Sequence, residues 1–239
     1  MKIILKETSV DYKTYDFGYA INAILENKES IEKAYSKGFL PYTNDVFSTL
    51  EEYYLARSIR INLKNYERLS ENNRVIRKID KKLGIEFKIF TKNEFDHSKD
   101  FKNFCIDFSK ERFSNKPLSI QRLELIISRD NYNKIFVFYF NKLPIGYVLT
   151  YFNKSIIHYW FSFYETKFMK DFSLGKYIME QVIYYAKLKK LNHVYLGTCY
   201  GNKALYKVRD FKGIEFYDGE IWNSNVKSLK EICKNDNID

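Results

Sequence analysis

Apolar residues in the second half of the chain fall into runs that predict a sheet and then a helix. Segments 135–141, 146–152 and 155–164 are rich in aromatic and β-branched residues, with short polar breaks between them. Such runs are typical of antiparallel strands joined in a meander. In 175–191 the apolar residues recur at helical spacing, and 193–199 has the composition of a buried strand.

The remaining elements of this half complete a recognisable order. Helices are predicted over 101–113 and 119–128, before the meander. A short helix over 202–210 and a strand over 213–222 close the chain. Meander, loop, helix, strand, helix and strand is similar to the element order of the GNAT acyltransferases. We therefore expect an α+β chain with a GNAT-like fold, in which helices flank a mixed, mainly antiparallel sheet.

The first half of the chain shows shorter elements. The predicted strands are 15–20 and 58–63, and the predicted helices are 31–37 and 70–83, the second of which stops at Gly84. The polar stretch 91–100 has no buried stripe and indicates a junction. We expect a smaller N-terminal α/β region over 1–92 and a GNAT-like catalytic domain over 93–239.

Composition narrows the class of protein. Of 239 residues, 45% are hydrophobic, so the chain can bury a substantial core. The cysteines Cys105, Cys199 and Cys233 form no CxxC pair, so we expect neither a metal centre nor a disulfide framework. The apolar stretch after Lys2 is too short for a signal peptide, and no run reaches the roughly 18 apolar residues of a membrane span. We expect a cytoplasmic protein with no membrane partner.

The positive net charge of the chain favours a polyanionic binding partner. The net charge is +10, and cations that neutralise phosphates release condensed counterions. A/T-biased coding also produces a chain rich in Lys, Asn, Ile and Tyr, so the total alone decides little. The distribution is more informative, because 57–82 holds nine basic residues against three acidic ones and 184–212 holds seven against one. Both segments suit a phosphate-backbone contact, although two solvated helix faces would give the same pattern.

The loop before the helix at 175–191 carries a candidate phosphate-binding motif. It reads Lys170-Asp171-Phe172-Ser173-Leu174-Gly175-Lys176-Tyr177. GNAT proteins have Arg/Gln-x-x-Gly-x-Gly/Ala here, and backbone N–H groups at a helix N-terminus attract phosphate. We expect the acyl donor to be bound by Lys170, Ser173, Leu174, Gly175 and Lys176. The alternative is an ordinary helix start capped by an Asp and a Ser.

Further motifs follow one family in order along the chain. The segments 163–165 and 172–177 resemble Tyr-Tyr-Asp-Pro and Leu-Ser-Leu-Gly-x-Tyr, and 195–197 followed by 203–207 resembles Tyr-Leu-Gly and Lys-Met-x-Tyr-Lys. In the first half, 35–39 is similar to Leu-x-x-Gly-Phe. The segment 60–78 is similar to three motifs that follow one another without a gap, namely Arg-Val-x-Val, then Phe, then Arg-Val-Leu-Arg-Arg. These are motifs of the arginyl-tRNA–protein transferases and the bacterial aspartate/glutamate leucyltransferases. The resemblance covers most of the chain and implies that 1–92 is an aminoacyl-tRNA–protein-transferase-like region.

Two departures from the family pattern stand out. Family members usually carry a cysteine cluster after the Gly-Phe segment, and 44–54 contains no cysteine. The basic Ser-Arg-Ser-Gln-Arg stretch is replaced by Leu-Ser-Glu-Asn-Asn at 69–73. Without the cysteine cluster, any metal or redox regulation of the family is not expected here. Without the basic stretch, the tRNA contact is weaker, which is consistent with a different donor.

The resemblance implies transfer of an amino acid from aminoacyl-tRNA to the N-terminal α-amine of a protein, as in N-degron modification. Because an aminoacyl ester is already activated, positioning and oxyanion stabilisation suffice and no metal or other cofactor is implied. The implied catalytic residues are Glu165, which would orient or deprotonate the amine, and Tyr206, which would return a proton to the leaving hydroxyl. The implied tRNA contacts are Arg74, Arg77, Lys78, Lys203, Lys207 and Arg209.

Two other functions remain open at this point. An acetyl-CoA-dependent GNAT N-acetyltransferase would use the same loop for a pyrophosphate, and a non-catalytic RNA- or protein-binding module would keep the fold without turnover. For single residues, Tyr206 and His158 are also compatible with core positions, Glu165 with a solvated strand end, and Cys199 has no base nearby in sequence. The transferred amino acid, the acceptor residue and the oligomeric state stay open.

Overall fold

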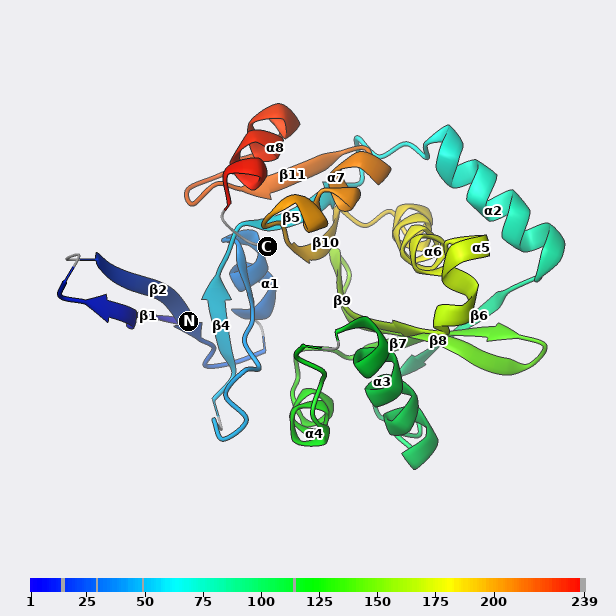
Figure 1. Cartoon of the computed structure of the whole chain (residues 1–239), viewed down its shortest axis with the longest axis horizontal. Helices are drawn as coiled ribbons and strands as arrows, with labels where there is room; N and C mark the ends of the chain where they lie inside the picture. Colours follow the sequence, from blue (N-terminus) through cyan, green and yellow to red (C-terminus); the bar gives the residue numbers. More distant parts are fainter. Residues whose placement is uncertain (14–15, 29, 49, 114, 237–239) are drawn as a thin grey trace.

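The computed structural model places helices on both faces of an eight-stranded sheet, with a smaller four-stranded sheet beside it (Figure 1). The structure describes residues 1–13, 16–28, 30–48, 50–113 and 115–236. The strand order of the large sheet is β12-β11-β5-β10-β9-β8-β7-β6. Its neighbouring strands are antiparallel except β9 and β10, which run parallel. The sheet is therefore mixed and mainly antiparallel.

Both faces of the large sheet are apolar. Its strands are β5 (Ser58–Asn62), β6 (Glu86–Thr91), β7 (Lys134–Phe140), β8 (Leu143–Phe152), β9 (Ile156–Tyr164), β10 (His193–Thr198), β11 (Ile214–Tyr217) and β12 (Trp222–Asn223). Because side chains alternate along a strand, Phe136 and Phe138 of β7 enter one core cluster while Ile135 and Val137 enter another. Such a strand reads as a continuous apolar run in the sequence.

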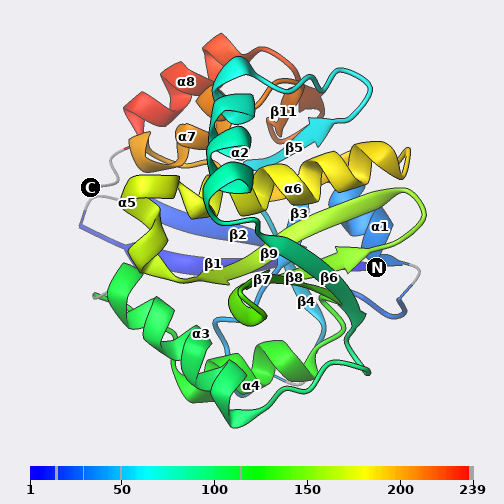
Figure 2. The same ribbon diagram turned by 90° about the vertical axis from the view of Figure 1, so that its right-hand side faces the viewer.

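The two core clusters are closed by different helices. The first contains buried residues of α2 (Ser70–Lys82), α6 (Leu174–Leu188) and α8 (Val226–Asn235), and the second contains those of α3 (Lys99–Arg112) and α4 (Ile120–Ser128). Figure 2 shows α2 and α6 on the side of the sheet opposite α3 and α4. The short helical segments are η1 (Thr166–Phe168), α5 (Met169–Phe172), η2 (Asn202–Ala204) and α7 (Tyr206–Asp210).

The smaller sheet comes from the first 55 residues. Its strands are β1 (Lys2–Asp11), β2 (Asp16–Ile24), β3 (Phe39–Pro41) and β4 (Glu52–Leu55), in the order β1-β2-β4-β3, and α1 (Ser30–Ser36) packs beside it. The buried rings of Tyr35 and Tyr53 join this sheet to Ile156 and Tyr195 of the large one. The β1–β2 hairpin projects from the body of the molecule (Figure 1).

The predicted α+β, GNAT-like class is confirmed by this order of elements. The meander, the following helix and the parallel strand appear as β7, β8, β9, α6 and β10. Asn141 and Lys142 both have positive φ and form the turn after β7, so β8 starts at Leu143, earlier than the predicted run that begins at 146. Residue 15 of the predicted strand 15–20 falls outside the described residues, and the rest of that segment lies in β2.

Several elements were not predicted from the sequence. They are β1, β3, β4, β6, α5 and α8. The predicted strand 213–222 is two short strands, β11 and β12, separated by a turn. The division between 1–92 and 93–239 remains a prediction, and strands from both sides of that boundary, β5 and β6 among them, belong to the large sheet.

A buried carboxylate holds the start of α2 against α6. Glu180 is 1% exposed, and its carboxylate accepts hydrogen bonds from Arg68 Nε at 2.9 Å, from Asn72 Nδ2 at 2.7 Å and from Tyr66 Oη. Burial and this neighbouring carboxylate raise the pKa of Tyr66 well above its usual value, so its hydroxyl stays protonated. The segment 66–72 is thereby fixed to the middle of α6.

Replacing Glu180 with Gln should destabilise the protein. The change leaves the Arg68 guanidinium without its counter-charge in a largely buried site, which costs about 3 kcal/mol of unfolding free energy. Urea unfolding followed by circular dichroism measures this. Glu67→Gln is the control, because that carboxylate forms an exposed ion pair with Lys212, and its loss should leave stability unchanged within error. Equal effects of the two changes would contradict the role given to Glu180.

Candidate active site

The parallel strands β9 and β10 separate in the middle of the large sheet. Their pairing joins His193, Val194 and Tyr195 to Ile156, Ile157 and His158 and goes no further. Beyond it, β9 pairs only with β8, and a β-bulge falls at Trp160, between Tyr159 and Phe161. Bulges re-aim side chains and end pairing. A V-shaped gap therefore opens between the two strands.

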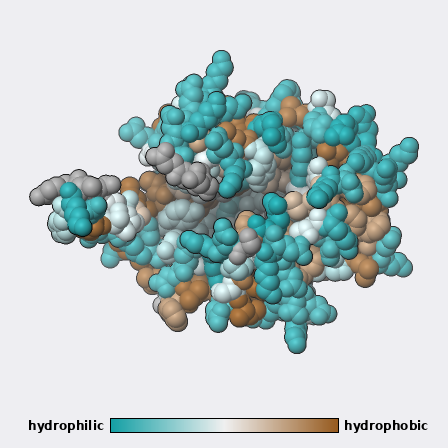
Figure 3. All heavy atoms as spheres, in the orientation of Figure 1, coloured by the Kyte–Doolittle hydropathy of each residue, from teal (hydrophilic) through white to brown (hydrophobic). Residues whose placement is uncertain are grey.

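Two cavities border this gap. The first, here called the helix-end cavity, has a volume of about 470 Å³ and is lined by residues that include Tyr164, Ser173, Gly175 and Tyr206. The second, here called the strand-end cavity, has a volume of about 400 Å³ and is lined by residues that include His158, Thr198 and Lys207. The face of the molecule seen in Figure 1 is hollowed at its centre and rimmed largely by hydrophilic side chains (Figure 3).

The N-terminus of α6 opens into the helix-end cavity. Ser173 has left-handed backbone angles (φ 53°, ψ 45°) and no side-chain capping hydrogen bond. Among the described residues, no acceptor bonds the backbone N–H groups of Leu174 and Gly175, as is usual in the first turn of a helix. These donors and the positive end of the helix dipole favour a bound anion. The Leu174 side chain itself is fully buried in the core.

Gly175 is required by a neighbouring ring. A β-carbon at this position would lie 2.5 Å from Tyr164 Oη, closer than real β-carbons approach. From the sequence, Gly175 was expected to let a phosphate come close to the backbone. In the structure, the Tyr164 ring also occupies the space where a β-carbon would lie. Any substitution here would have to displace that ring from the cavity wall.

Charged residues surround the helix-end cavity. Arg112, Lys176 and Arg209 line it together with Asp210 and Glu71. Asp210 is paired with Arg209 at 2.7 Å and with Lys176 at 3.6 Å. The Arg209 side chain remains 73% exposed, so it can turn toward a ligand.

Tyr206 of α7 also lines the helix-end cavity. Burial and the neighbouring Tyr164 raise its pKa to about 12. The hydroxyl is therefore protonated at neutral pH and can donate a hydrogen bond or a proton, although the ring remains 41% exposed.

His158 stands on the wall of the strand-end cavity. It is 1% exposed, and its Nδ1 lies 2.8 Å from Tyr35 Oη. Burial, together with the nearby Lys207 charge, lowers its pKa to about 3. The imidazole is thus neutral, and the Tyr35 contact fixes its orientation.

Lys207 occupies the mouth of the gap between the strands. Its Nζ donates to the carbonyl oxygens of Leu196 at 2.9 Å and Thr198 at 3.1 Å. Burial lowers its pKa to about 8. Nζ lies 5.9 Å from the centre of the Tyr206 ring, so α7 brings one residue to each cavity. The third N–H of this ammonium has no partner among the described residues.

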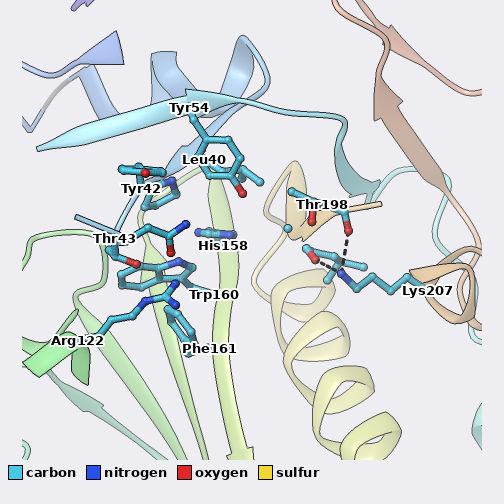
Figure 4. A pocket seen from close by; sticks show the side chains of 14 residues that line it. Leu40, Tyr42, Thr43, Tyr54, Arg122, His158, Trp160, Phe161, Thr198 and Lys207 are labelled. Carbon is cyan, nitrogen blue, oxygen red and sulfur yellow. Dashed lines mark hydrogen bonds between the residues drawn. The ribbon is translucent and has the colours of Figure 1, made fainter. Parts of the chain in front are cut away.

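Arg122 forms the opposite wall. Figure 4 shows it beside Trp160 and Phe161, across the cavity from Thr198 and Lys207. Its Nε is buried without a hydrogen-bond partner among the described residues, and burial lowers the pKa of the guanidinium. None of the described residues that line this cavity is acidic. Two cations therefore face the cavity without a counter-charge.

The other sequence-predicted residues lie outside both cavities. Glu165 forms an ion pair with Lys167 at 3.2 Å. Lys170 and Lys203 are exposed. Arg74 is paired with Glu71 at 2.8 Å, Arg77 is exposed, and Lys78 donates to the Asp171 carbonyl oxygen and lies over the Phe172 ring. The structure thus brings Ser173, Gly175, Lys176, Tyr206 and Arg209 together and places Lys207 in the second cavity.

Sequence reasoning missed Arg112, Arg122, Tyr164 and Trp160. No short motif surrounds the two arginines, and the bulge that exposes Trp160 has no sequence signature. Among the described residues, no group of three or more His, Cys, Asp or Glu side chains is placed to hold a metal ion. No helix in the described part of the chain is long and apolar enough to cross a membrane.

Comparisons with known proteins concern the fold. No protein-family model and no curated protein matches the sequence. Among solved structures, FemX has 13% identity and a TM-score of 0.48, covering 92% of this chain and 76% of that one. L-PGS from Bacillus licheniformis has 11% identity and a TM-score of 0.45, with 74% and 51% covered. The C-terminal domain of a protein assigned as a lysylphosphatidylglycerol synthetase from Agrobacterium fabrum has 8% identity and a TM-score of 0.47, with 88% and 70% covered.

Likenesses this distant do not bear on activity. None of them singles out the arginyl-tRNA–protein transferases, so that family assignment stays a prediction.

Lys207 should make the stability of the protein depend on pH. Its folded pKa of about 8 lies below the usual 10.5, so between these values the unfolded chain binds more protons than the folded one. The unfolding free energy of the wild type, relative to Lys207→Met, should therefore rise as the pH increases from about 8 toward 10. Urea unfolding of both proteins at several pH values tests this. A difference that stays constant with pH would contradict a depressed pKa.

Proposed function

We propose that this chain is an aminoacyltransferase that moves an amino acid from aminoacyl-tRNA to the N-terminal α-amine of a protein or peptide. The observation that carries the proposal is the gap between β9 and β10, with a cavity on each side and α7 in contact with both. A transfer reaction needs two substrates to meet at one point, and holding them there in the right orientation lowers the barrier.

The helix-end cavity suits the donor. The free N–H groups of α6, with Lys176, Arg112 and Arg209, match the phosphates of the terminal nucleotide. Arg74 and Arg77 lie farther along α2, beyond the cavity. They favour a long polyanion over coenzyme A, whose phosphates the cavity alone would satisfy.

The strand-end cavity suits the acceptor. The α-amine nitrogen attacks the ester carbonyl carbon, the carbonyl oxygen becomes an oxyanion, and the bond to the ribose oxygen then breaks. Only a neutral amine attacks, and its ordinary pKa near 8 supplies a useful fraction at neutral pH. Lys207 and Arg122 lower that pKa further by repelling the protonated form.

Two neighbouring residues carry the chemistry in this proposal. The unpartnered N–H of Lys207 stabilises the oxyanion, because its other two donors hold it against the Leu196 and Thr198 carbonyls. The protonated hydroxyl of Tyr206 gives a proton to the ribose oxygen as it leaves, and the proton that the attacking nitrogen loses restores this hydroxyl. Glu165, paired with Lys167 outside the cavities, has no part in this mechanism.

The charge of the strand-end cavity bears on the acceptor. With two unpaired cations and no acidic lining residue, it favours an N-terminus that carries negative charge nearby over a basic one.

The assay mixes the protein with tRNAs charged with labelled amino acids and with peptides that begin with Asp or Arg. We expect the Asp peptide to gain the mass of one amino acid. Acetyl-CoA in place of tRNA forms the second arm, and an acetylated peptide there would replace the proposal with an N-acetyltransferase. Saturable tRNA binding without any product would instead indicate a binding module.

Tyr206→Phe should slow transfer without weakening donor binding. Loss of the proton donor should lower the single-turnover rate about 100-fold, while the ring still lines the cavity. Quenched-flow measurement of peptide extension gives the rate, and anisotropy gives the Kd for tRNA. Tyr19→Phe is the control, since that ring is 59% exposed on the β1–β2 hairpin. An unchanged rate in Tyr206→Phe would remove this residue from the mechanism.

A further inference from the structure

A second basic hollow lies at the opposite end of α6 from the helix-end cavity. It has a volume of about 410 Å³, and its lining includes Lys64, Lys187, Lys190 and His193. None of the described residues that line it is acidic. Burial and the nearby Arg60 charge lower the pKa of His193 to about 4, so the positive charge here comes from the lysines alone. We call this site the lysine hollow.

The three lysines of the hollow differ in how firmly their side chains are fixed. Lys187 donates to the Leu63 carbonyl oxygen and is partly buried. Lys64 and Lys190 are exposed, and neither has an ion-pair partner among the described residues. One fixed cation and two free ones therefore face the same concavity, which makes it attractive to an anion.

One stripe of α6 connects the hollow to the helix-end cavity. Residues 176, 180, 184 and 187 recur at helical spacing on one side of the helix. Lys176 lines the helix-end cavity and Lys187 lines the lysine hollow. At 1.5 Å per residue, the two are separated by about 16 Å along the axis.

Between these ends the segment 66–72 covers the stripe, and the charges there are balanced. Arg68 lies over the Tyr184 ring at 4.0 Å and pairs with the buried Glu180. In Figure 2 the segment that leads from β5 to α2, which contains Lys64 and Arg68, runs beside α6. The acidic Glu67 of this segment is paired with Lys212 at 2.9 Å.

We propose that the surface between the two sites is an RNA-binding track: the backbone of the donor tRNA leaves the helix-end cavity, crosses the segment 66–72 that covers α6, and reaches the lysine hollow. The inference rests on the proposed function, because it assumes that the 3′ end of the tRNA enters the helix-end cavity. Cations at two sites about 16 Å apart can each contact a phosphate of one nucleic-acid backbone, which presents phosphates every few ångströms. Coenzyme A would bind at the helix-end cavity alone and would make no contact with the lysine hollow.

Lysines near the end of a helix also interact favourably with its dipole, and that alone could explain Lys187. Lys190 is different. Its φ is +58°, a left-handed position just after the helix where Gly or Asn is preferred. A lysine there is less favourable than Gly or Asn, so the local backbone does not require it.

Lys190→Asn is a variant that we expect to keep the stability of the fold. It introduces a residue favoured at this backbone position and removes one charge, so its melting temperature should equal or exceed that of the wild type. Combined with Lys64→Ala it removes both free cations of the hollow. Lys99→Ala with Lys230→Ala is the matched control, because these exposed lysines carry the same charge and lie on α3 and α8.

The experiment measures the Kd of uncharged tRNA by fluorescence anisotropy over a range of KCl concentrations. For Lys64→Ala/Lys190→Asn we expect affinity to fall about 10-fold at low salt, and the slope of log Kd against log salt to decrease by about 1.5. The control pair should change neither. A short single-stranded oligonucleotide with the 3′-terminal sequence of tRNA reaches only the helix-end cavity, so its affinity should be the same in all three proteins.

The outcomes separate this inference from the proposed function. Equal tRNA affinity in the wild type and Lys64→Ala/Lys190→Asn would overturn the track and leave the aminoacyltransferase proposal standing. The same loss in the control pair would also overturn it, by showing a general charge effect. If the wild type binds neither tRNA nor the oligonucleotide, both proposals fall.

Discussion

The loss of pairing between β9 and β10 is the constraint on which the rest of the site depends. A strand that stops pairing leaves backbone carbonyls that need a donor, because buried polar groups are rarely left unsatisfied. Here the donor is Lys207, whose Nζ bonds the carbonyls of Leu196 and Thr198. The side chain that satisfies the open strand edge is thereby held between the two cavities. The two hydrogen bonds that satisfy the open strand edge therefore also hold Lys207 in position for its proposed role in the reaction.

Much of the fold could be predicted because its central elements carry strong patterns. The meander and α6 are long and apolar, and β9 and β10 flank α6 in the chain. The strands β1, β3 and β4 are short or largely polar and were missed for that reason, and β6 lies at a polar junction. Of the site, the start of α6 and Tyr206 could be predicted from local motifs. Arg112 and Arg122 could not, since only packing of α3 and α4 against the sheet brings them near the cavities.

Two residues that the sequence analysis singled out do line the site, but for physical reasons other than the expected ones. Gly175 was expected from a phosphate-binding pattern, and it also makes room for the Tyr164 ring. Lys207 was expected as a cation that contacts tRNA, and it is instead a partly buried amine with a pKa of about 8. Charge and spacing can be read from a sequence, whereas burial depends on neighbours that are distant in the chain.

The position of β5 has a consequence for how the protein folds. This strand lies between β10 and β11, and Arg60 contacts Tyr195 across 135 residues of sequence. The large sheet cannot be completed until nearly the whole chain has been synthesised and that long loop has closed. Contacts of such high sequence separation slow folding and keep apolar strand edges open meanwhile. We expect slow refolding and a dependence on chaperones during synthesis, imposed by the topology that builds the gap between β9 and β10.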